Sequence, residues 1–224
     1  MNVVQRIGRF TILAVALTVA SISCGWTTAP ARDEAKKTTN HPQQILIIRH
    51  AEKTGDESDA HLSKRGKERA AVLDKLFVAS KDRPDPFPRP DFIFAAHNSK
   101  GSHRPVETVT PLAMKLKLPI NETYESKLPD APPAGGKEKA DSAPGMLALR
   151  DKLFSDSKYF GKTILVSWRH GSIPELAKTL KASKPPAKWE DEVFDRVWQI
   201  SYDEQGHATF LDRPQRLLPG DSEK

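Results

Sequence analysis

The chain has few of the features that would assign it to a disulfide-stabilised or nucleic-acid-binding class. Cys24 is the only cysteine among 224 residues, so an intramolecular disulfide is excluded. The 35 Lys and Arg residues exceed the 29 Asp and Glu residues only slightly, and the net charge is +6. These basic residues are scattered along the chain, whereas nucleic-acid binding requires them on one face or arm. No nucleic-acid partner is therefore expected.

The sequence also has no apolar run long enough to cross a bilayer as a helix. The uncharged residues 10–23 follow Arg6 and Arg9, but these 14 residues fall short of the roughly 20 that a transmembrane helix needs. A short apolar run behind basic residues is typical of a cleaved export signal. We expect residues 1–24 to be a signal peptide and the protein to be exported.

Cys24 stands where the signal of a bacterial lipoprotein places its acylated cysteine. The preceding Ser21, Ile22 and Ser23 resemble a lipobox in part, because Ser21 occupies the position where Leu is usual. Lipidation of Cys24 would anchor the protein to a membrane, and ordinary cleavage nearby would leave it periplasmic; both outcomes stay open. Residues 25–42 have no periodicity that would bury a face, and are expected to be a disordered tether.

Residues 43–214 are predicted to form one α/β domain. The run of Ile and Leu at residues 45–48 is typical of a central strand buried on both faces. Similar apolar runs follow at residues 92–96 and 163–167, and a turn at residues 203–206 between two strand-like stretches predicts a hairpin. Strands that alternate with helices predict a three-layer fold, with a mostly parallel sheet flanked by helices and an antiparallel C-terminal hairpin.

The segments between these strands carry helical signals. Ser63 is the expected N-cap of a first helix. A second helix should begin near Arg104 with Pro105 in its first turn, and Pro111 inside it predicts a kink or a break. Two shorter helices are expected at residues 146–154 and 174–180. The remaining long segments are predicted as loops or as a tail: residues 81–90, 129–145 and 215–224.

Arginine and histidine follow two of the predicted strands at the point where each strand ends. The first strand leads into Arg49 and His50, and a later strand leads into Arg169 and His170. Because ligands of an open parallel sheet gather at the carboxyl ends of its strands, the two histidines are expected in one pocket although they are 120 residues apart. Guanidinium groups bind phosphate oxygens, and a neutral imidazole beside them can act as a nucleophile.

The loop after residues 92–96 ends at a helix that begins with Arg104. Free backbone N–H groups, the helix dipole and the Arg104 guanidinium together favour a bound phosphoryl group. Within this loop, Ser99, Lys100 and Ser102 are either additional donors to the phosphate or solvent-exposed loop residues.

Three motifs, in this order and context, resemble those of the histidine phosphatase superfamily, also called phosphoglycerate-mutase-like. They are Arg-His-Ala-Glu at residues 49–52, Arg-Pro-Val-Glu-Thr at 104–108 and His-Gly at 170–171, with Leu-Ser-Lys-Arg-Gly at 62–66 as a supporting match. The resemblance covers residues 43–213. It implies that His50 accepts the phosphoryl group, that Arg49, Arg104 and His170 complete the phosphate pocket, and that no metal or organic cofactor is needed.

The resemblance also implies an acidic residue that protonates the leaving oxygen. Glu125 is the preferred candidate, with Glu122 and Asp130 as rivals. One branch of the superfamily carries a His-Asp pair, which is missing here because Gly171 follows His170. Arg169 adjoins the third motif, and the sequence leaves open whether its side chain faces the pocket.

These features predict an exported phosphomonoesterase that acts through a phosphohistidine intermediate on a small anionic phosphoester. Two alternatives stay open. A non-catalytic phospho-ligand binding protein tethered at the cell surface would use the same pocket without turnover. A phosphomutase is disfavoured, because export separates the protein from glycolytic substrates.

Overall fold

The computed structural model describes residues 39–56, 58–81, 83–128 and 143–223. The predicted signal peptide, most of the predicted tether, Cys24 and Asp130 lie outside the described residues. Within the described ranges, no helix combines the length and the apolar character that a membrane crossing requires.

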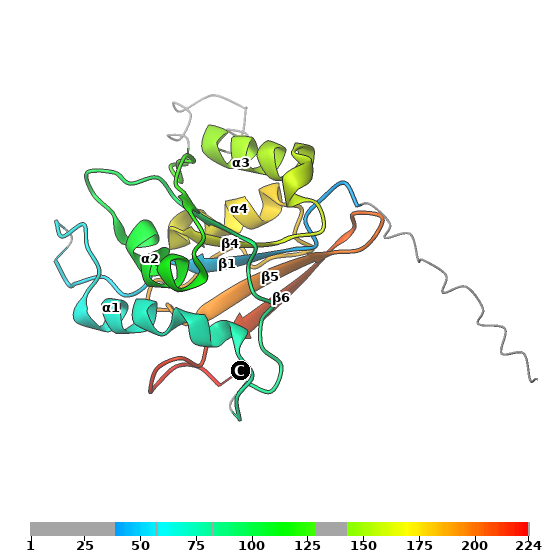
Figure 1. Ribbon diagram of the computed structural model, residues 1–224. Helices are drawn as coiled ribbons and strands as arrows, with labels where there is room; N and C mark the ends of the chain where they lie inside the picture. The colour runs from blue at the N-terminus through cyan, green and yellow to red at the C-terminus, as the bar shows by residue number, and fades with distance from the viewer. Residues whose placement is uncertain (1–38, 57, 82, 129–142, 224) are drawn as a thin grey trace, which may run out of the picture. The chain divides into compact units, whose positions relative to one another are not determined.

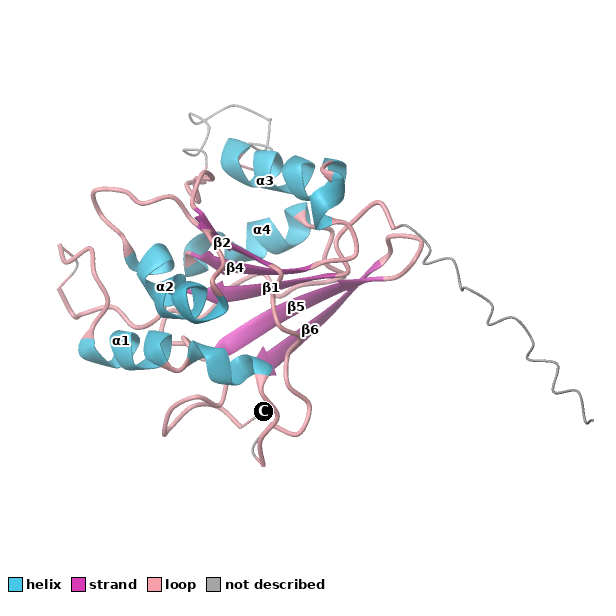
Figure 2. Ribbon diagram, viewed as in Figure 1, coloured by secondary structure: helices cyan, strands magenta, loops and turns pink. Residues whose placement is uncertain are grey.

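The described residues build one six-stranded sheet with the strand order β3-β2-β4-β1-β5-β6. The first four strands in this order run parallel, and the last two are antiparallel to their neighbours. The mostly parallel sheet with a C-terminal antiparallel hairpin is thus confirmed (Figure 2). The bounds are β1 Gln44–Arg49, β2 Phe92–Ala95, β3 Ile120–Asn121, β4 Thr163–Trp168, β5 Arg196–Tyr202 and β6 Ala208–Pro214.

The central strand β1 is buried along its whole length, as its apolar run predicts. Successive side chains of a strand point to opposite faces of the sheet. Ile45 and Ile47 accordingly belong to one apolar core, and Leu46 and Ile48 belong to another on the opposite face. β1 therefore stabilises two packing layers at once, which is why residues 45–48 are all apolar.

Helices cover both faces of the sheet, so the predicted three-layer arrangement is confirmed (Figure 1). On one face, Leu73 of a 3₁₀ turn and Leu112 of α2 pack in the core that contains Leu46. On the other face, Leu149 of α3 and Leu176 of α4 pack in the core that contains Ile45. The bounds are α1 Lys64–Ala71, α2 Arg104–Leu116, α3 Pro144–Ser155 and α4 Ile173–Thr179, with 3₁₀ turns at Leu73–Phe77, Ser157–Tyr159 and His170–Ser172.

The helix α1 begins as its sequence predicts and ends earlier. The Ser63 side chain caps the helix by accepting a hydrogen bond from the Gly66 N–H group at 3.1 Å. The helix ends at Ala71, and the apolar residues that follow lie in the 3₁₀ turn Leu73–Phe77. A tighter turn still places Leu73 in the core, so the apolar spacing alone does not distinguish it from a longer α-helix.

Pro111 does not break α2, which runs from Arg104 to Leu116. A proline removes one backbone donor from a helix, and the packing of α2 against the sheet outweighs that loss. Leu112 and Ala113, directly after the proline, are both buried in the core of this face. Lys117 follows the last residue of the helix, and its left-handed backbone (φ 56°) is a common way to terminate a helix.

The C-terminal residues that the sequence suggests as a tail pack against α1. Gln215 is buried, and the Asp221 carboxylate forms an ion pair with Arg69 at 2.8 Å. The same guanidinium pairs with Glu52 at 2.7 Å. Arg69 is itself buried, and a buried charge of this kind is tolerated only when it is paired. Asp221 therefore links the C-terminal segment to the loop that follows β1.

Candidate functional site

The two histidines predicted to share a pocket lie at the same edge of the sheet. β1 and β4 are parallel neighbours, with Arg49 opposite Trp168 at their carboxyl ends. The His50 N–H group continues this pairing by donating to the Trp168 carbonyl at 2.9 Å. The His50 and His170 rings lie 6.4 Å apart between centroids and nearly perpendicular, at 76°. The structure therefore brings them together across 120 residues of chain.

The His50 ring is held in one tautomer by its own backbone environment. Its Nδ1 atom lies 2.7 Å from the Ala51 carbonyl oxygen. A carbonyl oxygen only accepts, so Nδ1 carries the proton and donates it to this bond. In the neutral imidazole the lone pair is then on Nε2, which is the atom available for nucleophilic attack.

The protonation state of His50 follows from its burial. Burial lowers the pKa of His50 from 6.5 to about 3, and Arg49 and Arg104 act in the same direction. The hydrogen bond to the Ala51 carbonyl opposes this shift only in part. His50 is 4% exposed, so little water is available to stabilise an imidazolium. The imidazole is consequently neutral and nucleophilic over the whole physiological pH range.

Arg49 is fully buried, and backbone carbonyls of the segment before β5 hold one end of its guanidinium. Its Nη1 atom donates to the carbonyl oxygens of Glu190 (3.3 Å), Asp191 and Val193 (3.1 Å). The guanidinium carbon lies 3.7 Å from the centre of the Phe194 ring, in a cation–π contact. Burial lowers the pKa of Arg49 to about 10, which leaves the group positively charged at neutral pH.

Arg104 opens α2 and is held by two loop carbonyls. Its Nη1 atom donates to the Asp59 carbonyl at 2.5 Å, and its Nη2 atom donates to the Gly101 carbonyl at 3.4 Å. Thr108, one turn further along α2, connects this helix to the His50 loop. Its buried hydroxyl donates to the Arg104 carbonyl and accepts from the Ala51 N–H group, both at 2.8 Å. Arg104 and His50 are thereby held in a common frame.

His170 faces an acidic side chain on one edge. Its Nε2 atom lies 3.3 Å from a carboxylate oxygen of Asp191, whose side chain is 69% exposed. Burial and the Arg49 guanidinium lower the pKa of His170, and Asp191 opposes them. The balance makes His170 a group that can accept or donate a hydrogen bond beside a transferring phosphoryl group.

Several buried donors around His50 have no hydrogen-bond partner among the residues that the structure describes. They are Nε and Nη2 of Arg49, Nε of Arg104 and Nε of Arg169. Buried polar groups are nearly always paired, and an unpaired one costs about 1–3 kcal/mol. An oxyanion bound between these side chains would accept from the guanidinium groups and screen their mutual repulsion. The cluster therefore has the chemistry of a phosphate site.

The three predicted phosphate donors in the loop between β2 and α2 differ in their positions and contacts. Ser99 and Ser102 pair through two backbone hydrogen bonds of 3.1 Å each and form a tight turn. The Ser99 hydroxyl accepts a hydrogen bond from Nη2 of Arg169 at 2.7 Å, so it positions an arginine. Ser102 is buried, with no partner for its hydroxyl within the described part of the chain, and Lys100 is exposed at the tip.

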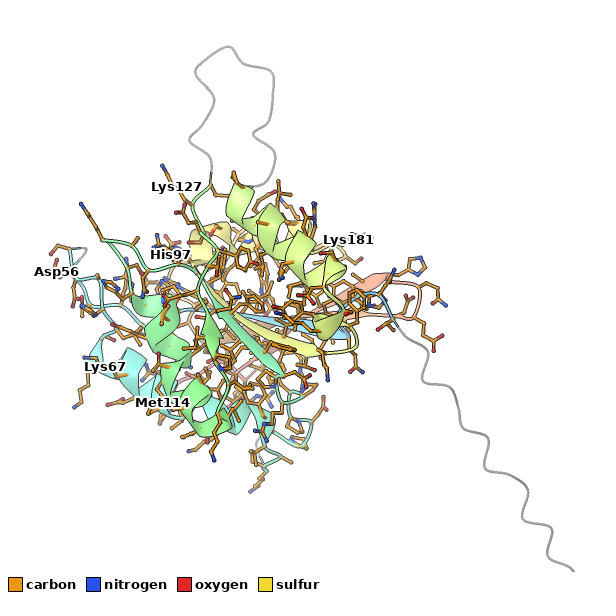
Figure 3. The ribbon with its side chains drawn as sticks, turned by 45° about the horizontal axis from the view of Figure 1, so that its top comes forward. Asp56, Lys67, His97, Met114, Lys127 and Lys181 are labelled. Carbon is orange, nitrogen blue, oxygen red and sulfur yellow. The ribbon has the colours of Figure 1, made fainter. Side chains whose placement is uncertain are left out.

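A pocket of about 540 Å³ adjoins this cluster on the side of Arg169. It contains Glu125, the preferred acid of the sequence analysis, whose side chain is exposed. The rival Glu122 is also exposed, and its carbonyl lies 2.9 Å from Nδ1 of His97. Figure 3 shows His97 and Lys127 on the same side of the molecule. The lining residues are His97, Asn98, Ser99, Lys100, Glu125, Ser126, Lys127 and Arg169.

Two glycines allow the close backbone contacts on which these loops depend. A Cβ atom on Gly66 would lie 2.3 Å from the Glu52 carbonyl oxygen, which explains the glycine in the motif at residues 62–66. A Cβ atom on Gly145 in α3 would lie 2.4 Å from the Glu125 carbonyl oxygen. Each contact is with backbone that cannot move aside easily, so a side chain at either glycine would displace the backbone of Glu52 or Glu125.

Sequence reasoning did not identify the segment at residues 190–194 as part of the site. Three of its backbone carbonyls hold Arg49, and its Phe194 ring contacts both Arg49 and His50, the latter at 6.2 Å between centroids. Backbone carbonyls have no sequence signature, and Phe194 lies outside every motif. Across the described ranges, no three His, Cys, Asp or Glu side chains are arranged to hold a metal ion.

Comparisons with known proteins give similarities in structure only. No family model matches the sequence, and no curated protein matches it. Similar solved structures include the protein histidine phosphatase SixA complexed with tungstate (16% identity, 77% of this chain, 97% of that chain, TM-score 0.46). Phosphoglycerate mutase from Bacillus anthracis is similar with 15% identity (79% and 94%, TM-score 0.44). A putative α-ribazole-5′-phosphate phosphatase from Escherichia coli is similar with 15% identity (81% and 98%, TM-score 0.44).

Proposed function

We propose that this protein is a phosphomonoesterase that transfers the phosphoryl group of its substrate to Nε2 of His50 and then hydrolyses the phosphohistidine. The observation that carries this proposal is the neutral, buried His50 imidazole, with its lone pair on Nε2, among arginine donors without partners. A nucleophile and an anion site are thereby combined in one cluster.

In the first step, the Nε2 lone pair of His50 attacks phosphorus, a P–N bond forms and the P–O ester bond breaks. The leaving oxygen takes up a proton, and we assign its delivery to Glu125, which lies in the adjoining pocket. In the second step, water attacks the phosphohistidine, the P–N bond breaks and inorganic phosphate leaves. The proton released by the water returns to Glu125, so the protein ends in its starting state.

The arginines act by stabilising charge on the transferring group. Arg49 and Arg104 are already held in place by backbone carbonyls, so little reorganisation is needed when phosphate binds. Their donors without partners point to stronger binding of an oxyanion than of a neutral ligand. His170, whose ring centre lies 6.4 Å from that of His50, would also stabilise charge on the phosphoryl group.

We further propose that the protein is exported. The basic residues before the apolar segment 10–23, and the cysteine after it, support export to the periplasm, either as a free protein or anchored through a lipid on Cys24. The substrate would then be a small phosphoester outside the cytoplasm. Globomycin-sensitive processing of the precursor, together with loss of membrane association in Cys24→Ser, would distinguish the anchored form from the free one.

The activity is tested by measuring phosphate release from a panel of phosphomonoesters with the purified protein. We expect turnover by the wild type and a loss on the order of 10⁴-fold or more in His50→Asn, because no other group replaces the nucleophile. His207→Asn is the matched control, since His207 lies in the exposed β5–β6 hairpin. Equal turnover by His50→Asn and the wild type would contradict the proposal.

The same purified protein distinguishes a phosphatase from a non-catalytic phospho-ligand binding protein. Tungstate or vanadate should bind the wild type and inhibit it competitively. If the protein binds these oxyanions but releases no phosphate from any ester, the cluster is a binding site and not a catalytic one. A phosphomutase would be recognised because its product retains the phosphate at a new position.

A further inference from the structure

We propose that the pocket beside the phosphate cluster binds a second anionic group of the substrate, and that Arg169 is the residue that selects for it. This inference rests on the proposed function, and it names the substrate class: a phosphomonoester that also carries a carboxylate or a second phosphate. Nothing in the three sequence motifs assigns a role to Arg169.

The position of Arg169 supports this role. It lies directly before His170 at the carboxyl end of β4, and it also lines the pocket of about 540 Å³. Ser99 accepts from one Nη atom at 2.7 Å, which restricts the guanidinium to one orientation. Its Nε atom is buried and has no partner in the described ranges of the chain. A preorganised guanidinium with a spare donor is suited to bind an oxyanion.

No carboxylate among the described residues forms an ion pair with Arg169, so Arg169 does not serve as half of a structural ion pair there. Its hydrogen-bond partner is a hydroxyl, so no carboxylate neutralises it there. Burial and the nearby Arg104 guanidinium lower the pKa of Arg169, which means that the folded protein disfavours its charge. An anion in the pocket would reverse this unfavourable balance.

The composition of the pocket determines which group it accepts. Lys100 and Lys127 line it together with Arg169, and Glu125 is the one carboxylate among its eight lining residues. The pocket falls within the usual range of about 300–1,000 Å³ for small-molecule sites. A neutral alcohol would offer no charge to the Arg169 guanidinium, whereas a carboxylate or phosphate would accept charge-assisted hydrogen bonds from it.

The role of Arg169 differs from that of the phosphate arginines, and kinetics can separate the two. An arginine that contacts the transferring phosphoryl group affects every ester equally. An arginine that contacts a second group affects only esters that carry this group. The informative quantity is therefore the ratio of kcat/KM between two esters that differ in one anionic group.

The test measures kcat/KM for two matched pairs of esters. The first pair is 4-carboxyphenyl phosphate and its uncharged isostere 4-carbamoylphenyl phosphate, and the second is glucose 1,6-bisphosphate and glucose 6-phosphate. For at least one pair, the wild type should prefer the more anionic ester by about 10- to 100-fold, the value of one or two hydrogen bonds to a charged group. In Arg169→Gln this ratio should fall at least tenfold, and Ser99→Ala should lower it less.

Arg89→Gln serves as the matched control, because it removes one positive charge from an exposed loop before β2. It should retain the wild-type ratio, which excludes an effect of net charge alone. Equal kcat/KM within both pairs in the wild type, or equal losses for all four esters in Arg169→Gln, would overturn the inference while leaving the phosphatase activity in place. Absence of turnover with every ester would instead refute the proposed function itself.

Discussion

The burial of His50 in its neutral form leads to a quantitative prediction about the stability of the protein at acidic pH. In the unfolded chain this histidine takes up a proton near its ordinary pKa of 6.5, whereas in the folded protein it does so only near 3. Between these two values the unfolded state binds more protons than the folded state, so the free energy of unfolding falls as the pH falls. From pH 7 to pH 4.5, His50 alone should remove roughly 2–3 kcal/mol.

The variant His50→Asn isolates this contribution, because asparagine does not titrate. Urea unfolding of the wild type and of His50→Asn at pH 7 and pH 4.5 gives the loss of stability for each protein over the same interval. The wild type should lose roughly 2–3 kcal/mol more than the variant. His207→Asn, which replaces an exposed histidine, should behave like the wild type. If the wild type and His50→Asn lose equal stability, His50 is not held neutral by burial.

Two further predictions concern the contacts that hold the His50 loop. Gly66→Ala should destabilise the protein by about 1–3 kcal/mol, measured by urea unfolding, because its Cβ atom would lie 2.3 Å from the Glu52 carbonyl oxygen; unchanged stability would show that the backbone yields. Thr108→Val should cost about 1–3 kcal/mol and lower kcat, because the buried Ala51 N–H group loses its acceptor. Thr110→Val, whose hydroxyl only donates within α2, is the matched control, and equal effects in both variants would contradict a role for the Ala51 contact.

The parts of the fold that the sequence predicts well are those in which many residues carry one signal. The strand β1 is a continuous apolar run, and its two-sided burial follows from that run. The strand β3 was not predicted, because its two residues, Ile120 and Asn121, give no periodicity. It exists through its parallel pairing with β2, which is a tertiary contact.

The residues of the site likewise fall into those that the sequence predicts and those that it does not. The motifs predicted that His50, Arg104 and His170 would meet, because strand ends of a parallel sheet share one edge, and the structure places them there. They did not predict that Ser99 would hold Arg169 or that Phe194 would cover Arg49. Such contacts depend on loop conformations, which single residues in irregular segments do not specify.

The most direct test of the account is to trap the phosphorylated protein. A ³²P-labelled phosphoester should be mixed with the protein and quenched in alkali within the first turnover, and the labelled peptide should then be identified. We expect an acid-labile label on the peptide that contains His50 and no label in His50→Asn. A label on another residue, or a label that persists in His50→Asn, would contradict the assignment of His50 as the nucleophile.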